Sequence, residues 1–287
     1  MAPSAPGGSL DILARMFARG LTDRLGQSFV VENRGGGGGN IGFDAVAKST
    51  ADGYTIMIGS DPLVINPIIY SNLTYDPVRD FAPIITIATL SQVLAVHPKV
   101  AAESFAEFVA LARARPNTIN VGTSGVGSPG HLAIALLSQA GVPLVHVPYR
   151  GAGPAVVDAV GGQIHATIVT LPATIAMIKQ NQLRALAVTS SRRSRFSPEV
   201  PSMAEQLPGV VVDSWQAFFA PAGTPANIVQ LLNAEFTALL KSRDVVDAFE
   251  TQAFEAGGGS PEDLGKFLRD ETGKWTPIVR AAGIRAE

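Results

Sequence analysis

The sequence predicts an α/β fold, in which β-sheet is flanked by helices. Short apolar segments rich in β-branched residues alternate along the chain with amphipathic segments of helical period. The 287 residues suit one large domain or two smaller ones. Because 46% of the residues are hydrophobic and only 16% are charged, the chain can build a sizeable core.

Each expected element is bounded by residues that start or stop regular structure. The first part predicts a helix LDILARMFARGLTDRLG ended by Gly26, a strand SFVVEN, a helix IGFDAVAKS, a strand YTIMIGS and a β-rich run APIITIATLSQVLAVHP. The middle predicts a helix SFAEFVALARARP, a strand TINVGTSG, a helix SPGHLAIALLSQAG, a strand VPLVHVPY, a helix GPAVVDAVGG, a strand HATIVT, a helix PATIAMIKQNQ and a strand LRALAVTSS. VDSWQAFFAPAG is again typical of a strand, and the remainder from Thr224 is mostly helical.

Three of the helices open with a hydroxyl residue followed by proline. The pairs are Ser128-Pro129, Thr224-Pro225 and Ser260-Pro261. A hydroxyl at the N-cap accepts a hydrogen bond from a free helix N–H, and proline fits the first helical position. The pattern therefore predicts a capped helix start at each pair.

Composition excludes several classes of function. The formal net charge is −2 without a long run of one sign, which argues against a nucleic-acid groove or an anionic membrane surface as partner. The absence of cysteine excludes disulfides, thiolate catalysis and cysteine metal sites. No segment approaches the roughly 18 apolar residues of a membrane span, and MAPSAPGGSLD lacks the basic and apolar parts of a signal peptide.

Three turns rich in glycine and hydroxyl residues lead into helices. They are PGGSLD at 6–11, RGGGGGNIG at 34–42 and GTSGVGSPGH at 122–131. Each would direct main-chain N–H groups and a helix N-terminus at one point, an arrangement that attracts anions. The sequence therefore indicates an anion-binding site.

The central glycine run also permits a dinucleotide-binding interpretation. Gly37, Gly39 and Gly42 form G-x-G-x-x-G, and Asp61 follows at about the distance expected for a ribose-binding carboxylate. Within five consecutive glycines, however, this motif occurs almost by necessity, so the match carries little information. It should also occupy the first strand-to-helix turn of its domain, whereas residues 7–26 precede it. An NAD(P)-dependent oxidoreductase therefore stays an alternative.

Hydrolytic and metal chemistry find weaker support. The histidines are His97, His131, His146 and His165. His131 is expected in the first turn of a capped helix beside Ser124 and Ser128, but neither serine lies in a G-x-S-x-G elbow. The pattern favours His131 as a polar wall contact in a binding cleft, and His97 and His146 as structural residues. No two histidines have metal-ligand spacing.

The stretch VPYRGAGPAVVDAVGG, residues 147–162, is a further candidate. A strand ends at Tyr149-Arg150, and Gly151 and Gly153 turn the chain into a helix. Tyr149 offers an aromatic ring with a hydroxyl, and Arg150 could bind a carboxylate with two N–H groups, although an ordinary solvated arginine is favoured there. The basic stretch SRRSRFSPE, 191–199, is expected to be a solvated loop.

Several stretches together resemble one family. APGGSLDILAR, VVENRGGGGGNIGFDAVAKSTADGYTIMIG, GTSGVGSPGHL, VPYRGAGPAVVDAVGG, LRALAVTSS and SW…APAGTP occur in the order found in the TctC-like, or Bug, extracytoplasmic solute receptors of tripartite tricarboxylate transporters. The resemblance runs nearly from end to end, and its specificity lies in the ordered set. It implies a two-lobe periplasmic-binding-protein (Venus flytrap, type II) fold, with a sheet flanked by helices in each lobe.

The resemblance also implies a function without catalysis or a cofactor. A periplasmic, monomeric receptor would capture a small di- or tricarboxylic or aromatic acid and deliver it to membrane permease subunits, without itself inserting into the membrane. Lobe 1 would comprise residues 1–98 and 220–287, and lobe 2 residues 99–219. The ligand cleft would lie between them, with hinges near 96–100 and 218–221. A carboxylate-sensing partner of a membrane signalling protein is a second alternative.

The family pattern assigns ligand-binding roles to both lobes. The positions are Gly7, Gly8, Ser9, Asp11 and Ser60 in lobe 1, and Ser124, Gly127, Ser128, His131, Tyr149, Gly151 and Thr170 in lobe 2. Asp11 is expected to order its loop, because a bare carboxylate would repel an anion. No residue is assigned to catalysis or to a metal.

The sequence departs from the family pattern at its start, at position 169 and at Ala217, where the family usually has glycine. The family begins with a signal peptide and a strand, whereas Met1–Ser4 precede APGG here. Many members have an aspartate at the end of the strand HATIVT, where Val169 stands. Since an aspartate could hold a ligand ammonium, its absence favours a plain carboxylate over an amino acid.

Overall fold

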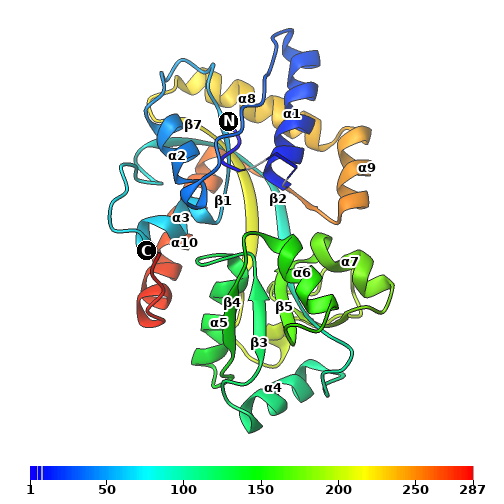
Figure 1. Cartoon of the computed structure of the whole chain (residues 1–287). Helices are drawn as coiled ribbons and strands as arrows, with labels where there is room; N and C mark the ends of the chain where they lie inside the picture. The colour runs from blue at the N-terminus through cyan, green and yellow to red at the C-terminus, as the bar shows by residue number, and fades with distance from the viewer. Residues whose placement is uncertain (5, 8, 287) are drawn as a thin grey trace. The chain divides into compact units, whose positions relative to one another are not determined.

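The longest strand, β2 (Phe81–Val96), contributes to both of the units into which the chain divides (Figure 1). The computed structural model describes residues 1–4, 6–7 and 9–286. Among them, unit 1 comprises Met1–Thr89 and Trp215–Pro277, and unit 2 comprises Leu90–Ser214 and Ile278–Ala286. The lobe boundaries suggested by the family pattern, after residues 98 and 219, stay a prediction.

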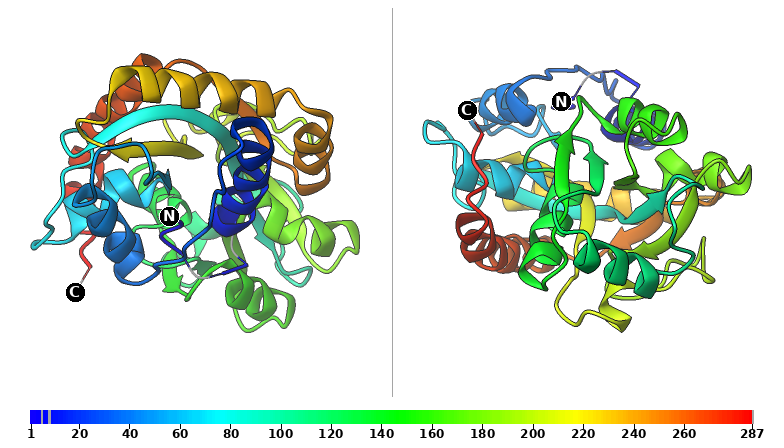
Figure 2. Two further views of the ribbon diagram at one scale, coloured as in Figure 1. Left: turned by 90° about the horizontal axis from the view of Figure 1, so that it is seen from above. Right: turned by 60° about the horizontal axis from the view of Figure 1, so that its bottom comes forward.

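Unit 1 is built on a mainly antiparallel sheet. Strand β1 (Met57–Ser60) pairs with β7 (Asp213–Pro221), β7 neighbours β2, and β8 (Glu255–Gly258) pairs with β2 at residues 86–89. The flanking helices are α1 (Ser9–Leu25), α2 (Asn40–Ala47), α3 (Pro62–Ile69), α8 (Ala226–Leu240), α9 (Arg243–Gln252) and α10 (Pro261–Ala281). Helix α8 passes over the curved strand β2 (Figure 2, left).

An aromatic cluster holds the helices of unit 1 on its sheet. The ring of Phe17 in α1 lies 5.8 Å from that of Phe218 in β7 and 5.5 Å from that of Phe236 in α8. Phe249 of α9 contacts the same ring at 6.4 Å. Phe17 has no exposed surface, so this contact of four elements fixes the direction in which α1 begins.

Unit 2 is built on a sheet whose first strands are parallel. Strand β3 (Asn120–Thr123) pairs in parallel with β4 (Val145–Pro148) and β5 (Ala166–Thr170), while β5 and β6 (Arg184–Val188) each pair antiparallel with the second half of β2. Its helices are α4 (Phe105–Ala114), α5 (Pro129–Gln139), α6 (Ala152–Val160) and α7 (Leu171–Lys179). Three of them directly follow a parallel strand.

Two of the three predicted hydroxyl caps are confirmed. Ser128 caps α5 by accepting from His131 N, and Ser260 Oγ accepts from Asp263 N at 3.2 Å at the start of α10. The third prediction was wrong, because Thr224 Oγ1 donates instead to Pro221 O at 2.8 Å. That hydroxyl closes the turn before α8 and leaves the helix start to Pro225.

Three elements differ from the sequence prediction. Residues 28–33 do not form the expected strand. Their backbone pairs with another segment only at the isolated bridge between Asn33 and Ala2, among the residues that the structure describes. Helix α3 was not predicted, since it contains two prolines and is apolar at nearly every position. Strand β8 was hidden by its glycines, and Gly257 is needed there because a Cβ would lie 2.5 Å from Thr86 O.

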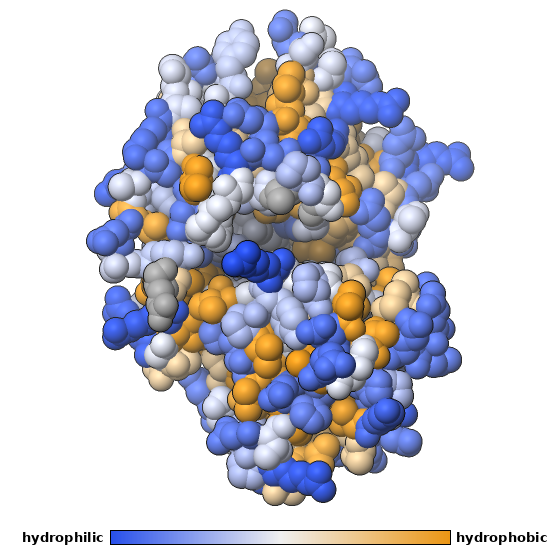
Figure 3. All heavy atoms as spheres, viewed as in Figure 1, coloured by the Kyte–Doolittle hydropathy of each residue, from blue (hydrophilic) through white to orange (hydrophobic). Residues whose placement is uncertain are grey.

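Apolar residues are scattered over the surface of the protein. On the face drawn in Figure 3, hydrophobic residues are interspersed among hydrophilic ones. None of the described helices has both the length and the apolar character that a membrane-spanning segment needs. The described residues also contain no cluster of three or more histidine, aspartate or glutamate side chains suited to a metal ion.

Candidate functional site

Three helix N-termini gather at one edge of the parallel sheet in unit 2. Strands β3, β4 and β5 are parallel neighbours, so their carboxyl ends meet at the same edge. Helices α5, α6 and α7 begin within a few residues of these ends. The positive ends of three helix dipoles therefore lie along one edge, and carboxyl ends of parallel strands are where open α/β sheets bind ligands.

The turn after β3 is held by its own hydroxyl and imidazole groups. Gly125 and Gly127 have φ of 134° and 73°, values that L side chains rarely adopt. Ser128 Oγ donates to Gly125 O at 2.7 Å and accepts from His131 N at 3.4 Å. The Ser128 hydroxyl is thus used in ordering the turn and capping α5.

His131 and His146 form a stacked pair behind this turn. Their ring centroids are 3.8 Å apart at an interplanar angle of 16°. His131 Nδ1 accepts from Gly127 N at 3.2 Å, and His146 Nε2 lies 2.7 Å from Thr123 Oγ1. The pKa of each ring is lowered to about 4, chiefly by burial, and in His131 also by the neighbouring His146. Both rings are therefore neutral at pH 7.

This geometry speaks against the serine hydrolase interpretation. In the described part of the chain no serine hydroxyl bonds to the ring of His131, because Gly127 N occupies Nδ1 and the bond with Ser128 uses the main chain. His131 Nε2 then carries the ring proton and can donate to an acceptor. His146, expected to be structural, supports that ring directly.

Close packing fixes the start of α5 against β5. A Cβ built on Gly130 would lie 2.1 Å from Ile168 O, far inside contact distance. Only glycine allows the helix to come so near the neighbouring strand. The start of α5 is thereby held against β5 near Ile168, two residues before the strand ends at Thr170.

Tyr149 and Gly151 lie next to the same turn. Tyr149 N donates to Thr123 O at 3.1 Å, and Gly151 N donates to Ser124 O at 3.2 Å. The phenol of Tyr149 donates to Asp158 Oδ2 at 2.6 Å, and burial and this carboxylate raise its pKa to about 12. Because the hydroxyl proton of Tyr149 is donated to Asp158, the residue can offer a ligand only its hydroxyl oxygen, as an acceptor, and the face of its ring.

At the starts of α6 and α7 the N-cap residues leave the main-chain N–H groups without a side-chain bond. Gly151, with φ of 108°, and Thr170 are the N-caps, and neither supplies a side-chain cap bond. Thr170 is half-buried, while Arg150 at the end of β4 is exposed. The structure thus brings Ser124, Gly127, His131, Tyr149, Gly151 and Thr170 to one edge of unit 2.

Val169 does not carry the argument drawn from it. Its side chain has no exposed surface and packs with Ala95, Ile164 and Leu183 in the core of unit 2. The neighbouring residue Thr170 ends the strand. The absence of a charge at position 169 therefore gives no indication of whether a ligand carries an ammonium group.

In unit 1, Asp11 orders the turn before α1. Its carboxylate accepts from Gly7 N at 2.8 Å and from Asn33 Nδ2 at 2.9 Å, and it pairs with Arg15 at 3.0 Å. These hydrogen bonds, with that of Arg15 the strongest, hold its pKa at about 2. Asp11 is the ordering residue the sequence suggested. Gly8 falls outside the described residues.

Gln216 is a residue of this region that the sequence reasoning missed. It lies in β7 opposite Ser60 of β1, and its Nε2 donates to Ser9 Oγ at 2.9 Å. Its Oε1 is buried without a partner among the described residues. A glutamine in the otherwise apolar run WQAFFA was the signal that could have identified it. It links two of the predicted site residues, Ser9 and Ser60.

The central glycine run is closely packed. Four successive glycines, Gly36 to Gly39, have positive φ. Asn66 Nδ2 donates to Gly38 O at 2.9 Å, and a Cβ on Gly42 would lie 2.7 Å from Pro3 Cβ. These contacts serve close backbone approach, as expected. Asp61 is 8% exposed and its pKa is raised to about 8 by burial, which is unsuited to an ionised ribose acceptor.

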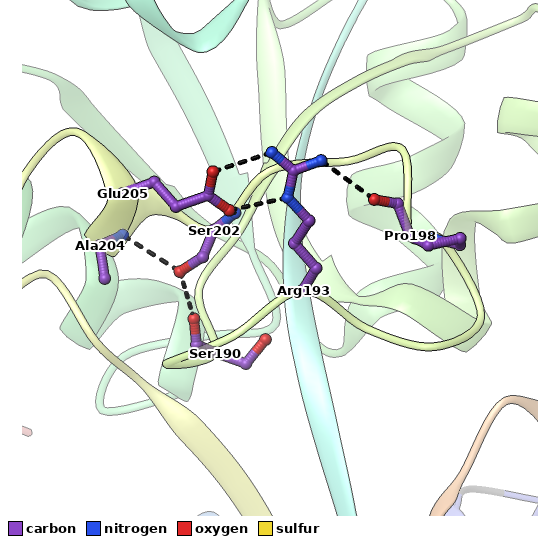
Figure 4. A network of polar contacts seen from close by, with 6 residues as sticks. All are labelled: Ser190, Arg193, Pro198, Ser202, Ala204 and Glu205. Carbon is purple, nitrogen blue, oxygen red and sulfur yellow. Dashed lines mark hydrogen bonds and ion pairs between the residues drawn. The ribbon is translucent and has the colours of Figure 1, made fainter.

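The basic stretch at 191–199 is ordered by an ion pair. Arg193 donates to both carboxylate oxygens of Glu205 at 2.8 Å and to Pro198 O at 3.1 Å (Figure 4). Glu205 Oε1 also accepts from Ser202 N at 2.9 Å. This Arg193–Glu205 clamp closes a loop of unit 2. Arg195 in the same stretch lies over the ring of Phe196 at 4.4 Å, so at least two of the three arginines are not simply solvated.

Comparison with known proteins gives one consistent result. The family model described as "Tripartite tricarboxylate transporter family receptor", TctC, matches residues 13–284. The chain is 39% identical over 287 residues to Protein BugT of Bordetella pertussis, covering 99% of this chain and 88% of the relative. The dinucleotide-dependent enzyme is not favoured by any of these likenesses.

Solved structures agree with the family. R. palustris Rpa4515 with adipate has a TM-score of 0.89 at 38% identity, covering 99% of this chain and 96% of that one. MatC (Rpa3494) from Rhodopseudomonas palustris with bound malate has a TM-score of 0.83 at 28% identity, covering 96% of each chain. With the periplasmic-binding-protein fold and the family match over residues 13–284, the chain belongs to the TctC, or Bug, family of solute-binding receptors of tripartite tricarboxylate transporters.

Proposed function

We propose that this protein captures a small dicarboxylate in the periplasm, as a monomer and without catalysis, and presents it to the permease subunits of a tripartite tricarboxylate transporter. The observation that carries the proposal is the convergence of three helix N-termini at the carboxyl edge of β3, β4 and β5. A carboxylate there would be held by main-chain N–H groups and the helix dipoles.

The protonation states of the site fit an anionic ligand. The His131 ring is neutral at pH 7 and offers an Nε2–H, so it donates a hydrogen bond without needing a counter-charge when the site is empty. Asp11, the carboxylate of the predicted ligand loop in unit 1, is already bonded to Gly7, Asn33 and Arg15. A dicarboxylate therefore meets donors rather than an unpaired negative charge.

The proposed class of ligand is supported by two similar proteins whose structures contain a ligand. Two family members were solved with adipate and with malate, and both are small dicarboxylates. We further propose, from family membership, that predicted residues of both lobes, including Ser9 and Ser60, contact one ligand, and that the lobes close on it.

A binding screen tests the proposed function. The purified protein is partly unfolded, dialysed to remove carried-over ligand and refolded, and its thermal unfolding is followed with adipate, malate, citrate, nicotinate, NAD and NADP. A ligand at a hundred times its dissociation constant adds about 2.7 kcal/mol to the unfolding free energy, which raises the midpoint by a few degrees. Stabilisation by dicarboxylates supports the proposal, whereas stabilisation by a dinucleotide alone overturns it.

A pair of variants locates the site. Thr170→Val removes a hydroxyl that makes no cap bond, and we expect it to weaken binding of the best acid about tenfold, the worth of one hydrogen bond to a charged group. The matched control is Thr251→Val in α9, whose hydroxyl bonds only to Asp247 O. Equal affinities of the two variants in calorimetric titration would remove Thr170 from the site.

A further inference from the structure

A pocket of unit 2 lies at the opposite edge of its sheet from the candidate site. It has a volume of about 540 Å³ and is formed where β3 and β5 begin and β2 ends. In Figure 1 helix α4 lies at this end of the unit. The lining includes His97, Lys99, Arg115 and His165 but no aspartate or glutamate. The pocket is therefore rich in donors and free of carboxylates.

Both imidazoles of the pocket are fixed by the main chain. Lys99 N donates to His97 Nδ1 at 3.1 Å, and Asn120 N donates to His165 Nδ1 at 3.0 Å. Because Nδ1 accepts in each ring, the proton of the neutral imidazole is on Nε2. Neither Nε2 has a hydrogen-bond partner among the described residues. The pocket thus offers two oriented N–H donors.

Glycine keeps one of these donors accessible. Gly162 has φ of 70°, and a Cβ built there would lie 3.5 Å from His97 Nε2. A side chain at this position would therefore cover the nitrogen. With Gly161 beside it in the pocket lining, the backbone leaves the space in front of His97 open.

The two cations of the pocket have no acidic partner. In the part of the chain that the structure describes, the side chains of Lys99 and Arg115 make neither an ion pair nor a hydrogen bond. Arg115 caps the C-terminus of α4, where a cation is favoured by the helix dipole. That effect accounts for one positive charge at this place. It does not account for Lys99, or for two imidazoles held with their second nitrogen free.

We propose that this pocket binds a small divalent oxyanion of the size of phosphate, separately from the carboxylate site of the same unit. Arg115 and Lys99 would neutralise its charge, and the Nε2–H groups of His97 and His165 would donate to its oxygens. The proposal does not depend on the proposed function.

The four histidines of the chain allow a direct test by NMR. Two of them, His97 and His165, line this pocket, and the other two belong to the candidate site. Inorganic phosphate is titrated at pH 7.5 and constant ionic strength, with chloride as the balancing anion, while the imidazole ¹H–¹⁵N resonances are recorded. We expect saturable shifts of the two pocket histidines and none of the other two. A parallel titration with sulfate shows whether any divalent tetrahedral oxyanion suffices.

Charge variants decide whether the binding is specific. Arg115→Gln and Lys99→Gln should each raise the dissociation constant of phosphate about three- to tenfold. Lys179→Gln, which removes an exposed charge from α7 of the same unit, should leave it unchanged. Shifts that rise linearly without saturation, that include all four histidines, or that weaken equally in Lys179→Gln would overturn the proposal.

Discussion

At the scale of single residues, burial decides what Asp61 can do. Its carboxyl group is 8% exposed at the start of α3, and desolvation first, then the nearby Glu271, raise its pKa from 3.8 to about 8. In the unfolded chain the same group ionises near its ordinary pKa. The folded state therefore holds a proton that the unfolded state releases between about pH 4 and pH 8, and stability falls as the pH rises through that range.

Replacement of Asp61 by asparagine should remove this pH dependence. Asp61→Asn is expected to raise the unfolding free energy at pH 8 by a few kcal/mol and to change it little at pH 4.5, because the neutral amide resembles the protonated acid. Urea unfolding at the two pH values measures it. Asp80→Asn is a control of opposite sign, since Arg79 holds the pKa of Asp80 below its ordinary value. An unchanged slope in Asp61→Asn would contradict the expectation.

Gly130 is a residue whose missing side chain matters. Gly130→Ala would place a methyl group 2.1 Å from Ile168 O, and we expect a loss of about 1–3 kcal/mol as overpacking moves α5 away from β5. Binding of the best acid should weaken in parallel. Gly273→Ala in α10 is the matched control, because its Cβ meets nothing within 4 Å. It should be neutral or stabilise by up to about 1 kcal/mol, as alanine is the better helix former.

At the scale of elements, the stacked histidines couple β4 to the start of α5. Both rings are neutral in the folded protein with pKa values near 4, and each would ionise near 6.5 in the unfolded chain. The unfolded state then binds more protons between about pH 6.5 and pH 4. Stability is therefore fully present above pH 6.5 and is lost as the pH falls toward 4.

The double variant His131→Gln/His146→Gln tests this coupling. It should show a smaller loss of unfolding free energy between pH 7 and pH 4.5 than the unaltered protein, although its stability at pH 7 is lower because the stacked contact is gone. Urea titrations at both pH values give the difference. A slope as steep as that of the unaltered chain would mean that other groups dominate the acid response.

The order of the elements was predictable from local signals, but their partners were not. Gly26 and the Ser128-Pro129 pair ended and started helices where the pattern placed them. In contrast, the partnership of His146 with His131 depends on the pairing of β3 with β4, and that of Gln216 with Ser9 on residues 207 positions apart. Such contacts carry no local period, so sequence reasoning found the turns of the site and missed the side chains that brace them.

At the scale of the whole molecule, the chain crosses between the units inside regular elements. The division falls within β2, at Ser214–Trp215 in β7, and at Pro277–Ile278 in α10. Each unit thus contains part of a strand or helix that continues in the other. Unfolding one unit leaves these elements without half of their length, so we expect the two units to unfold together.

Calorimetry of two core variants tests this expectation. Phe17→Ala in unit 1 and Phe108→Ala in unit 2 each remove a ring without exposed surface, at a cost of about 3–5 kcal/mol. Each should lower the midpoint of a single transition. Two transitions, of which each variant shifts only one, would show that the units unfold independently.

The Arg193–Glu205 clamp has a consequence for proteolysis. Three arginines, at 192, 193 and 195, lie in a segment without helix or strand, which is the kind of site that trypsin cuts. Arg193 is tied by its guanidinium at both sides, to Glu205 and to Pro198. Cleavage requires the chain to leave that geometry and extend in the protease. The order in which limited trypsin digestion cuts after these arginines therefore reports how firmly the clamp is closed, and raising the salt concentration should hasten the cut after Arg193.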